Sequence, residues 1–132
     1  MTTGAPAHIL VIDDDVDFLE YVGIVLRSAG YVVDTATNAE RGLQAMKQKR
    51  PDLVIADVMM SMSMDGLVID HQMAQDPGLR DVPLLMVSAI VSDGDTFLDR
   101  TPETRRYAGL MRKPLDPAAL LRTVAELVAN EP

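Results

Sequence analysis

The chain has 132 residues, of which 48% are hydrophobic and 24% charged, and its formal net charge is −8. This length fits one compact domain, and the composition is that of a globular chain. The absence of cysteine excludes disulfides, thiolate zinc sites and a cysteine nucleophile, and so acidic a chain is a poor partner for nucleic acid or anionic membranes. Since the chain also has no bilayer-length apolar stretch and no signal-peptide pattern at residues 1–7, we expect a cytoplasmic protein.

Five short segments are predicted to be strands, and the first of them is a β-branched apolar run, as expected for a strand buried on both faces of a parallel sheet. They are residues 8–12 (HILVI), 31–36 (YVVDTA), 52–57 (DLVIAD), 82–88 (VPLLMVS) and 109–112 (GLMR).

Helical patterns lie between these strands. After the first strand, apolar residues recur at helical spacing, namely Phe18, Val22, Val25 and Ala29, with Leu19 and Leu26 beside them. Asp15 is the predicted N-cap of this helix and Gly30 its stop. The further predictions are a helix capped by Asn38 that carries Leu43 and Met46, a third helix near residues 67–75, and a last helix that begins at Asp116-Pro117. The segment 93–106 contains Pro102 and gives no clear helical pattern.

This alternation predicts an α/β fold, a single doubly wound (βα)5 flavodoxin-like domain with a parallel five-stranded sheet in the order 2-1-3-4-5. We expect residues 1–7 to form a short tail and residues 8–130 to form the domain. In such a sheet, ligands bind at the carboxyl ends of the strands.

Polar side chains stand at four of these carboxyl ends. Asp13 and Asp14 follow the first strand, Asp57 ends the third, Ser88 ends the fourth and Lys113 follows the fifth. Three neighbouring carboxylates repel one another unless they are protonated or bind a cation, and oxygen ligands of high charge suit Mg²⁺. A lysine and a hydroxyl beside them could stabilise the oxygens of a phosphoryl group. The pattern therefore predicts phosphoryl transfer to Asp57 with Mg²⁺ as cofactor.

The same segments resemble the response regulator receiver family over essentially the whole chain. The resemblance is carried by ILVIDDD with Asp13 and Asp14, DLVIADVMM with Asp57, VSA with Ser88, and KP with Lys113. Each motif is weak alone, but their order and their positions at strand ends make the combination specific.

The resemblance implies a phosphoacceptor that is not a turnover enzyme. Asp57, Ser88 and Lys113 would be the catalytic residues, Asp13, Asp14, Asp57 and Met59 the metal-binding positions, and Ser88 and Leu110 the switch positions. A histidine kinase or histidine phosphotransfer protein would donate the phosphoryl group, and a downstream protein would read the face formed by the fourth helix, the fifth strand and the fifth helix. The Lys113-Pro114 bond would be cis. Direct binding of nucleic acid or membrane is not expected, and homodimer formation stays open.

Three departures from the family pattern concern the loops and the output face. Ser61 stands where the family usually has proline, and Asp65-Gly66 comes one residue late. Leu110 replaces the usual tyrosine or phenylalanine, and the stretch from Ser88 to Lys113 is a few residues long. We therefore expect an intact active site beside an atypical output face.

Two positions that influence the lifetime of the phosphorylated family members are Met59 and Ile90 here, both apolar. An apolar side chain offers no hydrogen bond to an attacking water, so slow self-dephosphorylation is predicted.

Asp15 is expected to be a helix cap only. His8 and His71 are expected in surface or edge positions, without a role in catalysis or metal binding.

Two other functions compete with this one. The first is a degenerate receiver that binds proteins without accepting phosphate, which the altered loop and Leu110 favour. The second is a Mg²⁺-dependent phosphatase or a flavodoxin-like enzyme. A phosphatase of the haloacid dehalogenase type would need two aspartates at the spacing of Asp13 and Asp15, but such enzymes normally have a longer chain with a cap.

Overall fold

The computed structural model describes residues 6–58, 65–89 and 108–129. They form an all-parallel five-stranded sheet in the order β2-β1-β3-β4-β5, as predicted. The elements in chain order are β1 (His8–Ile12), α1 (Val16–Ser28), β2 (Val32–Ala36), α2 (Ala39–Gln48), β3 (Leu53–Asp57), α3 (Asp65–Gln75), β4 (Leu84–Ser88), β5 (Gly109–Arg112) and α4 (Pro117–Ala129). The segment in which a fourth helix is expected lies outside the described residues, so the label α4 belongs to the last helix.

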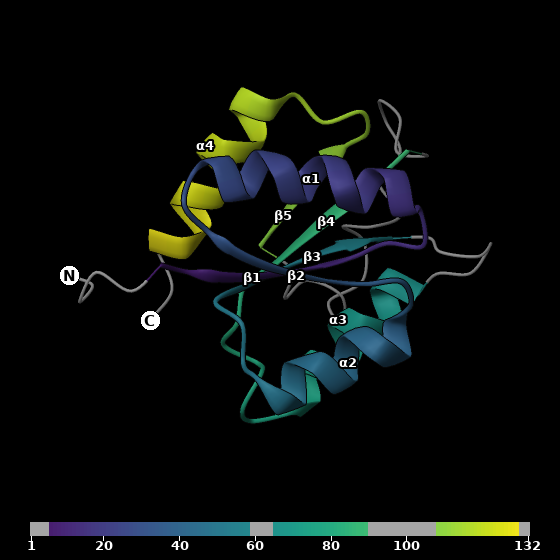
Figure 1. Cartoon of the computed structure of the whole chain (residues 1–132). Helices are drawn as coiled ribbons and strands as arrows, with labels where there is room; N and C mark the ends of the chain where they lie inside the picture. Colours follow the sequence, from purple (N-terminus) through teal and green to yellow (C-terminus); the bar gives the residue numbers. More distant parts are fainter. Residues whose placement is uncertain (1–5, 59–64, 90–107, 130–132) are drawn as a thin grey trace.

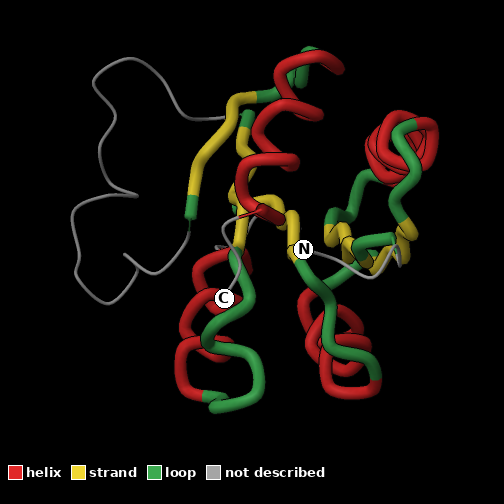
Figure 2. Tube along the Cα trace, turned by 90° about the vertical axis from the view of Figure 1, so that its left-hand side faces the viewer, coloured by secondary structure: helices red, strands yellow, loops and turns green. Residues whose placement is uncertain are grey.

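The helices cover both faces of the sheet. In Figure 1, α1 and α4 lie above the strands, and α2 and α3 lie below them. Figure 2 shows the same three layers from the side, with the strands between the helices. No helix among the described residues has the length and apolar character needed to cross a membrane.

Alternate residues of each central strand contribute to two separate hydrophobic clusters, because successive side chains of a strand point to opposite faces. In β1, Ile9 and Val11 pack with α1 and α4, whereas Leu10 and Ile12 pack with α2 and α3. Leu53 and Ile55 of β3 belong to the first of these faces as well. This alternation places Asp57, two residues after Ile55, on the side of the sheet that faces α1.

The predicted helix caps are confirmed. The Asp15 side chain accepts hydrogen bonds from the backbone N–H groups of Asp17 and Phe18, so this residue is the N-cap of α1. Asn38 caps α2 in the same way, and the Asp116 carboxylate accepts from the N–H of Ala119 at the start of α4. Gly30 adopts a φ of 96° just after α1, a conformation that favours glycine.

The structure corrects two details of the predicted helices. The buried residues of α1 are Leu19, Val22, Gly23 and Leu26, whereas Ala29 is exposed. The predicted Leu19, Val22 and Leu26 are thus buried, and Phe18 and Val25 are partly buried against the same cluster. Helix α3 begins at Asp65, two residues earlier than predicted.

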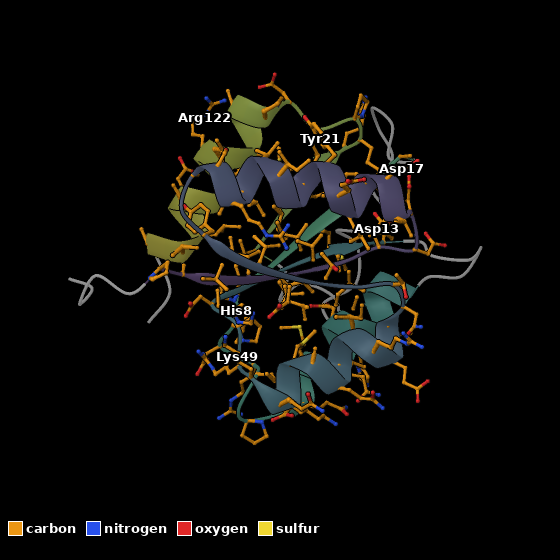
Figure 3. The ribbon with its side chains drawn as sticks, viewed as in Figure 1. His8, Asp13, Asp17, Tyr21, Lys49 and Arg122 are labelled. Atoms are coloured by element: carbon orange, nitrogen blue, oxygen red, sulfur yellow. The ribbon has the colours of Figure 1, made fainter. Side chains whose placement is uncertain are left out.

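His8 lies at the amino end of β1 and is only 8% exposed, so the prediction of a surface position is wrong for this histidine. Its Nε2 lies 2.6 Å from Oδ2 of Asp34 on the neighbouring β2, and its backbone N–H donates to the Asp52 carboxylate at 2.7 Å. Figure 3 shows His8 and Asp13 at opposite ends of the strand. His71 is exposed, as expected.

Candidate functional site

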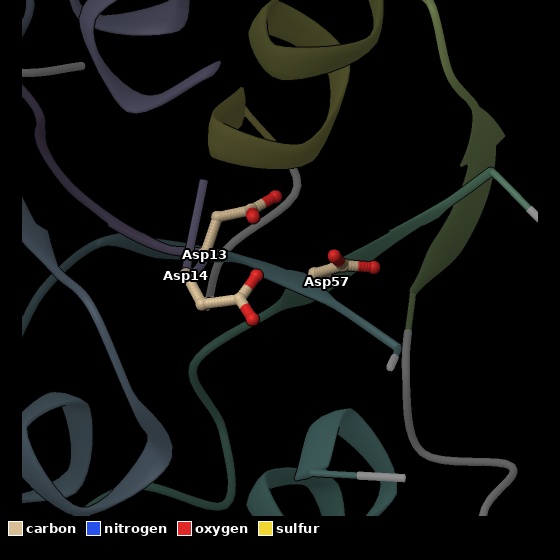
Figure 4. Close-up of side chains that lie close together, drawn as sticks. All are labelled: Asp13, Asp14 and Asp57. Atoms are coloured by element: carbon tan, nitrogen blue, oxygen red, sulfur yellow. The ribbon is translucent and has the colours of Figure 1, made fainter. Parts of the chain in front are cut away.

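Three aspartates meet at the carboxyl end of the sheet. Asp13 and Asp14 directly follow β1, and Asp57 is the last residue of β3, the strand that pairs with β1. One carboxylate oxygen from each lies within 4.8 Å of those of the other two, and Figure 4 shows the three side chains together. Asp13 and Asp57 are buried, whereas Asp14 is exposed. The cluster therefore opens to solvent on the side of Asp14.

Lys113, which follows the edge strand β5, brings a positive charge to this cluster. Its Nζ lies 2.7 Å from Oδ2 of Asp13 and 3.2 Å from Oδ2 of Asp57. The backbone N–H of Lys113 donates to the carbonyl of Ser88 at 2.9 Å, which fixes the end of β5 against the end of β4. The Lys113-Pro114 peptide bond is cis, as predicted. The lysine side chain thus reaches past β4 to carboxylates that belong to β3 and to the end of β1.

The close packing of these groups alters their affinity for protons. Burial raises the pKa of the Asp13 carboxyl, and the hydrogen bonds from Lys113 and from the N–H of Asp15 oppose this effect without cancelling it. Burial alone would lower the pKa of Lys113, but the carboxylates of Asp13 and Asp57 together outweigh it, and the pKa is raised. Lys113 therefore keeps its proton at neutral pH. A second positive charge nearby would stabilise the ionised form of the buried Asp13.

The donor set fits a hard divalent cation. It consists of carboxylate oxygens from two adjacent strand ends, one of them accessible to solvent, without sulfur or imidazole among the clustered side chains. Such ligands suit Mg²⁺, which retains several waters and also binds phosphate oxygens. The neighbouring ammonium group adds a fixed charge for an incoming anion.

A family model described as the response regulator receiver domain matches residues 9–125. The chain belongs to this family. The described part of the receiver domain contains both the acidic cluster and its lysine.

Known proteins of similar sequence and structure agree with this assignment. The receiver domain is 32% identical over 120 residues to the transcriptional regulatory protein GlrR of Escherichia coli (strain K12), covering 90% of this chain but only 26% of that protein. It is similar in structure to a protein of Chloroflexus aurantiacus J-10-fl described as a response regulator, with 30% identity, a TM-score of 0.82 and coverage of 96% of this chain and all of that one. The chemotaxis response regulator CheY4 of Vibrio cholerae shows 26% identity, a TM-score of 0.76 and coverage of 93% and 99%.

Two of the remaining predicted site residues, Ser88 and Leu110, lie in the described part of the chain. Ser88 ends β4 and is 1% exposed, and it pairs with Arg112, the residue before Lys113. Leu110 lies on β5 opposite Met86 and is 38% exposed, so it presents an aliphatic side chain at the edge of the sheet. Met59, Ser61 and Ile90 lie outside the described residues.

One residue next to the site was not singled out from the sequence. The aromatic ring of Phe18, in the first turn of α1, lies under the ammonium group of Lys113, with Nζ 4.2 Å from the ring centroid. Helical spacing indicates only that Phe18 belongs to the apolar stripe of its helix. Its position three residues after the N-cap Asp15 was the available signal, because that turn begins at the edge of the site.

Proposed function

We propose that this receiver domain accepts a phosphoryl group on Asp57 from a histidine kinase or a histidine phosphotransfer protein. The observation that carries the proposal is the position of Lys113, whose ammonium group contacts Asp57 at 3.2 Å while Asp13 and Asp14 complete an acidic cluster. A fixed cation beside the acceptor oxygen can stabilise negative charge on a transferred phosphoryl group.

Each side chain of the cluster has a role in this transfer. An Asp57 oxygen would form the new bond to phosphorus as the bond to the donor nitrogen breaks, giving an acyl phosphate. Asp13, Asp14 and Asp57, with Met59 as a further position, would hold Mg²⁺. The ion would offset the carboxylate charge and bind a phosphoryl oxygen. Lys113 would contact a second phosphoryl oxygen, and the Ser88 hydroxyl would donate to a third.

The output of the domain follows from the same proposal. Phosphorylation would change the charge at Asp57, and this change would act through Ser88 and β5 on the face that includes Leu110. A downstream protein would bind to that face. Because Leu110 has no aromatic ring, this face would work without the usual aromatic switch. We take residues 8–130 as the signalling unit, with residues 1–7 as a tail. The proposal includes no direct contact with DNA or membrane, and it leaves homodimer formation open.

Two further features belong to the proposal. Domains of this family are signalling modules, and the phosphorylated form would decay slowly if Met59 and Ile90 line the path of the attacking water. A half-life of only seconds for the acyl phosphate would contradict this. A chain without cysteine also has no need of an oxidising compartment, which fits a cytoplasmic location.

The test is intact-mass spectrometry after incubation with Mg²⁺ and a small acyl-phosphate donor. The expected result is one added phosphoryl group in the native protein and none after Asp57→Asn, which keeps the size of the side chain. Chelation of the metal should abolish the addition as well. If neither the small donor nor a cognate kinase adds any mass, the protein is a phosphate-independent binding module, the alternative that Leu110 favours.

A further inference from the structure

The ammonium group of Lys113 has an aromatic neighbour as well as two acidic ones. The centroid of the Phe18 ring lies 4.2 Å from Nζ, within the range of a cation–π contact. Phe18 is half-buried, and the Lys113 side chain is only 17% exposed. Such contacts are stronger where water is excluded, because the attraction between the cation and the ring is then less screened.

A second residue of the same helix contacts the segment that carries the lysine. The Tyr21 hydroxyl donates a hydrogen bond of 2.9 Å to the carbonyl of Leu115, two residues after Lys113. Leu115 is buried in the hydrophobic cluster between the sheet, α1 and α4, so this carbonyl belongs to a fixed part of the chain. In Figure 3, Tyr21 lies on α1 beside the loop that leads into α4.

Phe18 and Tyr21 are three residues apart, which places them on one side of α1. Together they contact residues 113–116, the lysine loop between β5 and α4, at two points. The ring meets the charged end of Lys113, and the hydroxyl meets the backbone carbonyl of Leu115. Helix α1 begins at Val16, two residues after Asp14, which together with Asp13 follows β1. The same short stretch of chain therefore provides two of the carboxylates and both aromatic contacts to the lysine.

A lysine needs such restraint at this site. Its side chain is long and flexible, and Nζ lies closer to Asp13 than to the phosphoryl acceptor Asp57, at 2.7 Å against 3.2 Å. An additional hydrogen-bond acceptor would compete with the phosphoryl group for the ammonium protons. An aromatic ring attracts the charge but occupies none of those protons in a strong hydrogen bond, so it can hold the cation in place and leave it available.

We infer that Phe18 and Tyr21 are positioning residues, which hold Lys113 where it stabilises the phosphoryl group received by Asp57. The inference rests on the proposed function. Both residues act through Lys113 and touch none of the reacting atoms. Phe18 also packs against the hydrophobic cluster, so the test must separate positioning from simple packing.

The experiment compares the rate of phosphoryl uptake by the full chain, with Mg²⁺ and a small acyl-phosphate donor, across four variants. Phe18→Leu keeps an apolar side chain but removes the ring, and uptake should slow about tenfold. Phe18→Tyr restores the ring and should return the rate to within about twofold of the native value. Tyr21→Phe removes only the hydroxyl and should slow uptake about threefold. Val22→Ala destabilises the same helix but keeps both the Phe18 ring and the Tyr21 hydroxyl, and it should leave the rate unchanged.

An NMR measurement that needs no phosphoryl donor accompanies the rates. The ring current of Phe18 should shift the Lys113 side-chain resonances upfield in the native protein and in Phe18→Tyr, and the shift should vanish in Phe18→Leu. If the native protein is phosphorylated but Phe18→Leu reacts at the native rate, or Val22→Ala slows uptake equally, the inference is wrong and the proposed function stands. If the native protein takes up no phosphoryl group from any donor, the proposed function fails, and the NMR shift shows separately whether the ring holds the lysine.

Discussion

Carboxylates lie near both ends of β1, but the groups that contact them differ between the two ends. At the amino end, the Asp34 carboxylate faces the His8 ring at 2.6 Å, and the Asp52 carboxylate accepts the backbone N–H of His8 at 2.7 Å. Each carboxylate there has its own donor. At the carboxyl end, Asp13 and Asp57 share the ammonium group of Lys113, and Asp14 lies beside them.

The difference separates carboxylates that are paired one to one from the candidate site, where they share a cation. The contacts at the amino end connect β1 to Asp34 on β2 and to Asp52 just before β3, and these paired carboxylates gain little from any added ligand. At the carboxyl end, the clustered carboxylates outnumber the lysine, so added positive charge would lower the free energy of the folded state. Strand β1 therefore has paired polar groups at its amino end and the candidate ligand site at its carboxyl end.

Removal of the shared cation should have the largest effect on this comparison. For Lys113→Met, we expect phosphoryl uptake at Asp57 to slow about a hundredfold, because the fixed charge beside the acceptor is lost. The free energy of unfolding without Mg²⁺ should fall by about 2 kcal/mol, because two buried carboxylates lose their partner. Uptake kinetics and urea denaturation measure the two effects. An unchanged uptake rate would show that Lys113 serves stability alone.

Mg²⁺ should stabilise the carboxyl end selectively. At a concentration one hundred times its Kd, a ligand that binds only the folded state adds about 2.7 kcal/mol to the free energy of unfolding. Asp14→Asn should weaken Mg²⁺ binding about tenfold or more, because the site loses one of three charges. The control is Asp17→Asn, the same change at an exposed carboxylate of α1 that is outside the cluster. Equal weakening by both variants, measured by calorimetry, would contradict a specific site.

A break at the amino end should affect stability and leave the functional site untouched. For His8→Asn, we expect a loss of about 1 kcal/mol in the free energy of unfolding, since the contact between the buried ring and Asp34 is removed. The Kd for Mg²⁺ and the rate of phosphoryl uptake should stay at native values. Asp34→Asn is the matched change on the partner strand. A clear change of Mg²⁺ affinity in either variant would mean that the two ends of β1 are coupled.

The smallest effect is a gain of stability in a variant of the functional site. Burial raises the pKa of Asp13, so its ionised form carries a cost in the folded state at neutral pH, and Asp13→Asn should raise the melting temperature slightly without Mg²⁺. The new amide oxygen can still accept the N–H of Asp15. The gain should disappear as the pH falls below the ordinary carboxyl range, where Asp13 is protonated in the folded and unfolded states. A lower melting temperature at neutral pH would mean that the contact with Lys113 outweighs the cost of burial.

The sequence predicted the parts of the fold that depend on local pattern. The bounds of β1 and β5 match the prediction, and so do the caps at Asp15 and Asn38, because strand burial and helix capping depend on residues within a few positions. The meeting of Asp13, Asp57 and Lys113 was also predictable, because the carboxyl ends of parallel strands share one edge. Whether the cluster binds Mg²⁺ and phosphoryl groups remains a prediction.

The failures concern contacts between distant segments. The exposure of Ala29 depends on how α1 turns against the sheet, and helical spacing alone leaves that angle open. The burial of His8 depends on Asp34 and Asp52, which belong to other segments of the chain. Phe18 approaches Lys113 across 95 positions of sequence, so its role beside the site could be recognised only in three dimensions.

The burial pattern of β5 has a consequence for how this domain could be observed at work. Of the five described strands, β5 alone has no buried residue, and only four residues hold it in the sheet. Such a strand contributes little hydrophobic free energy, so its local opening should be easier than that of the inner strands. The side chain of Lys113, the next residue, contacts Asp13 after β1 and Asp57 at the end of β3. The rate at which the backbone amide hydrogens of Gly109–Arg112 exchange with deuterium should therefore depend on whether Asp57 is phosphorylated. Strand β5, at the edge of the sheet, would report that state.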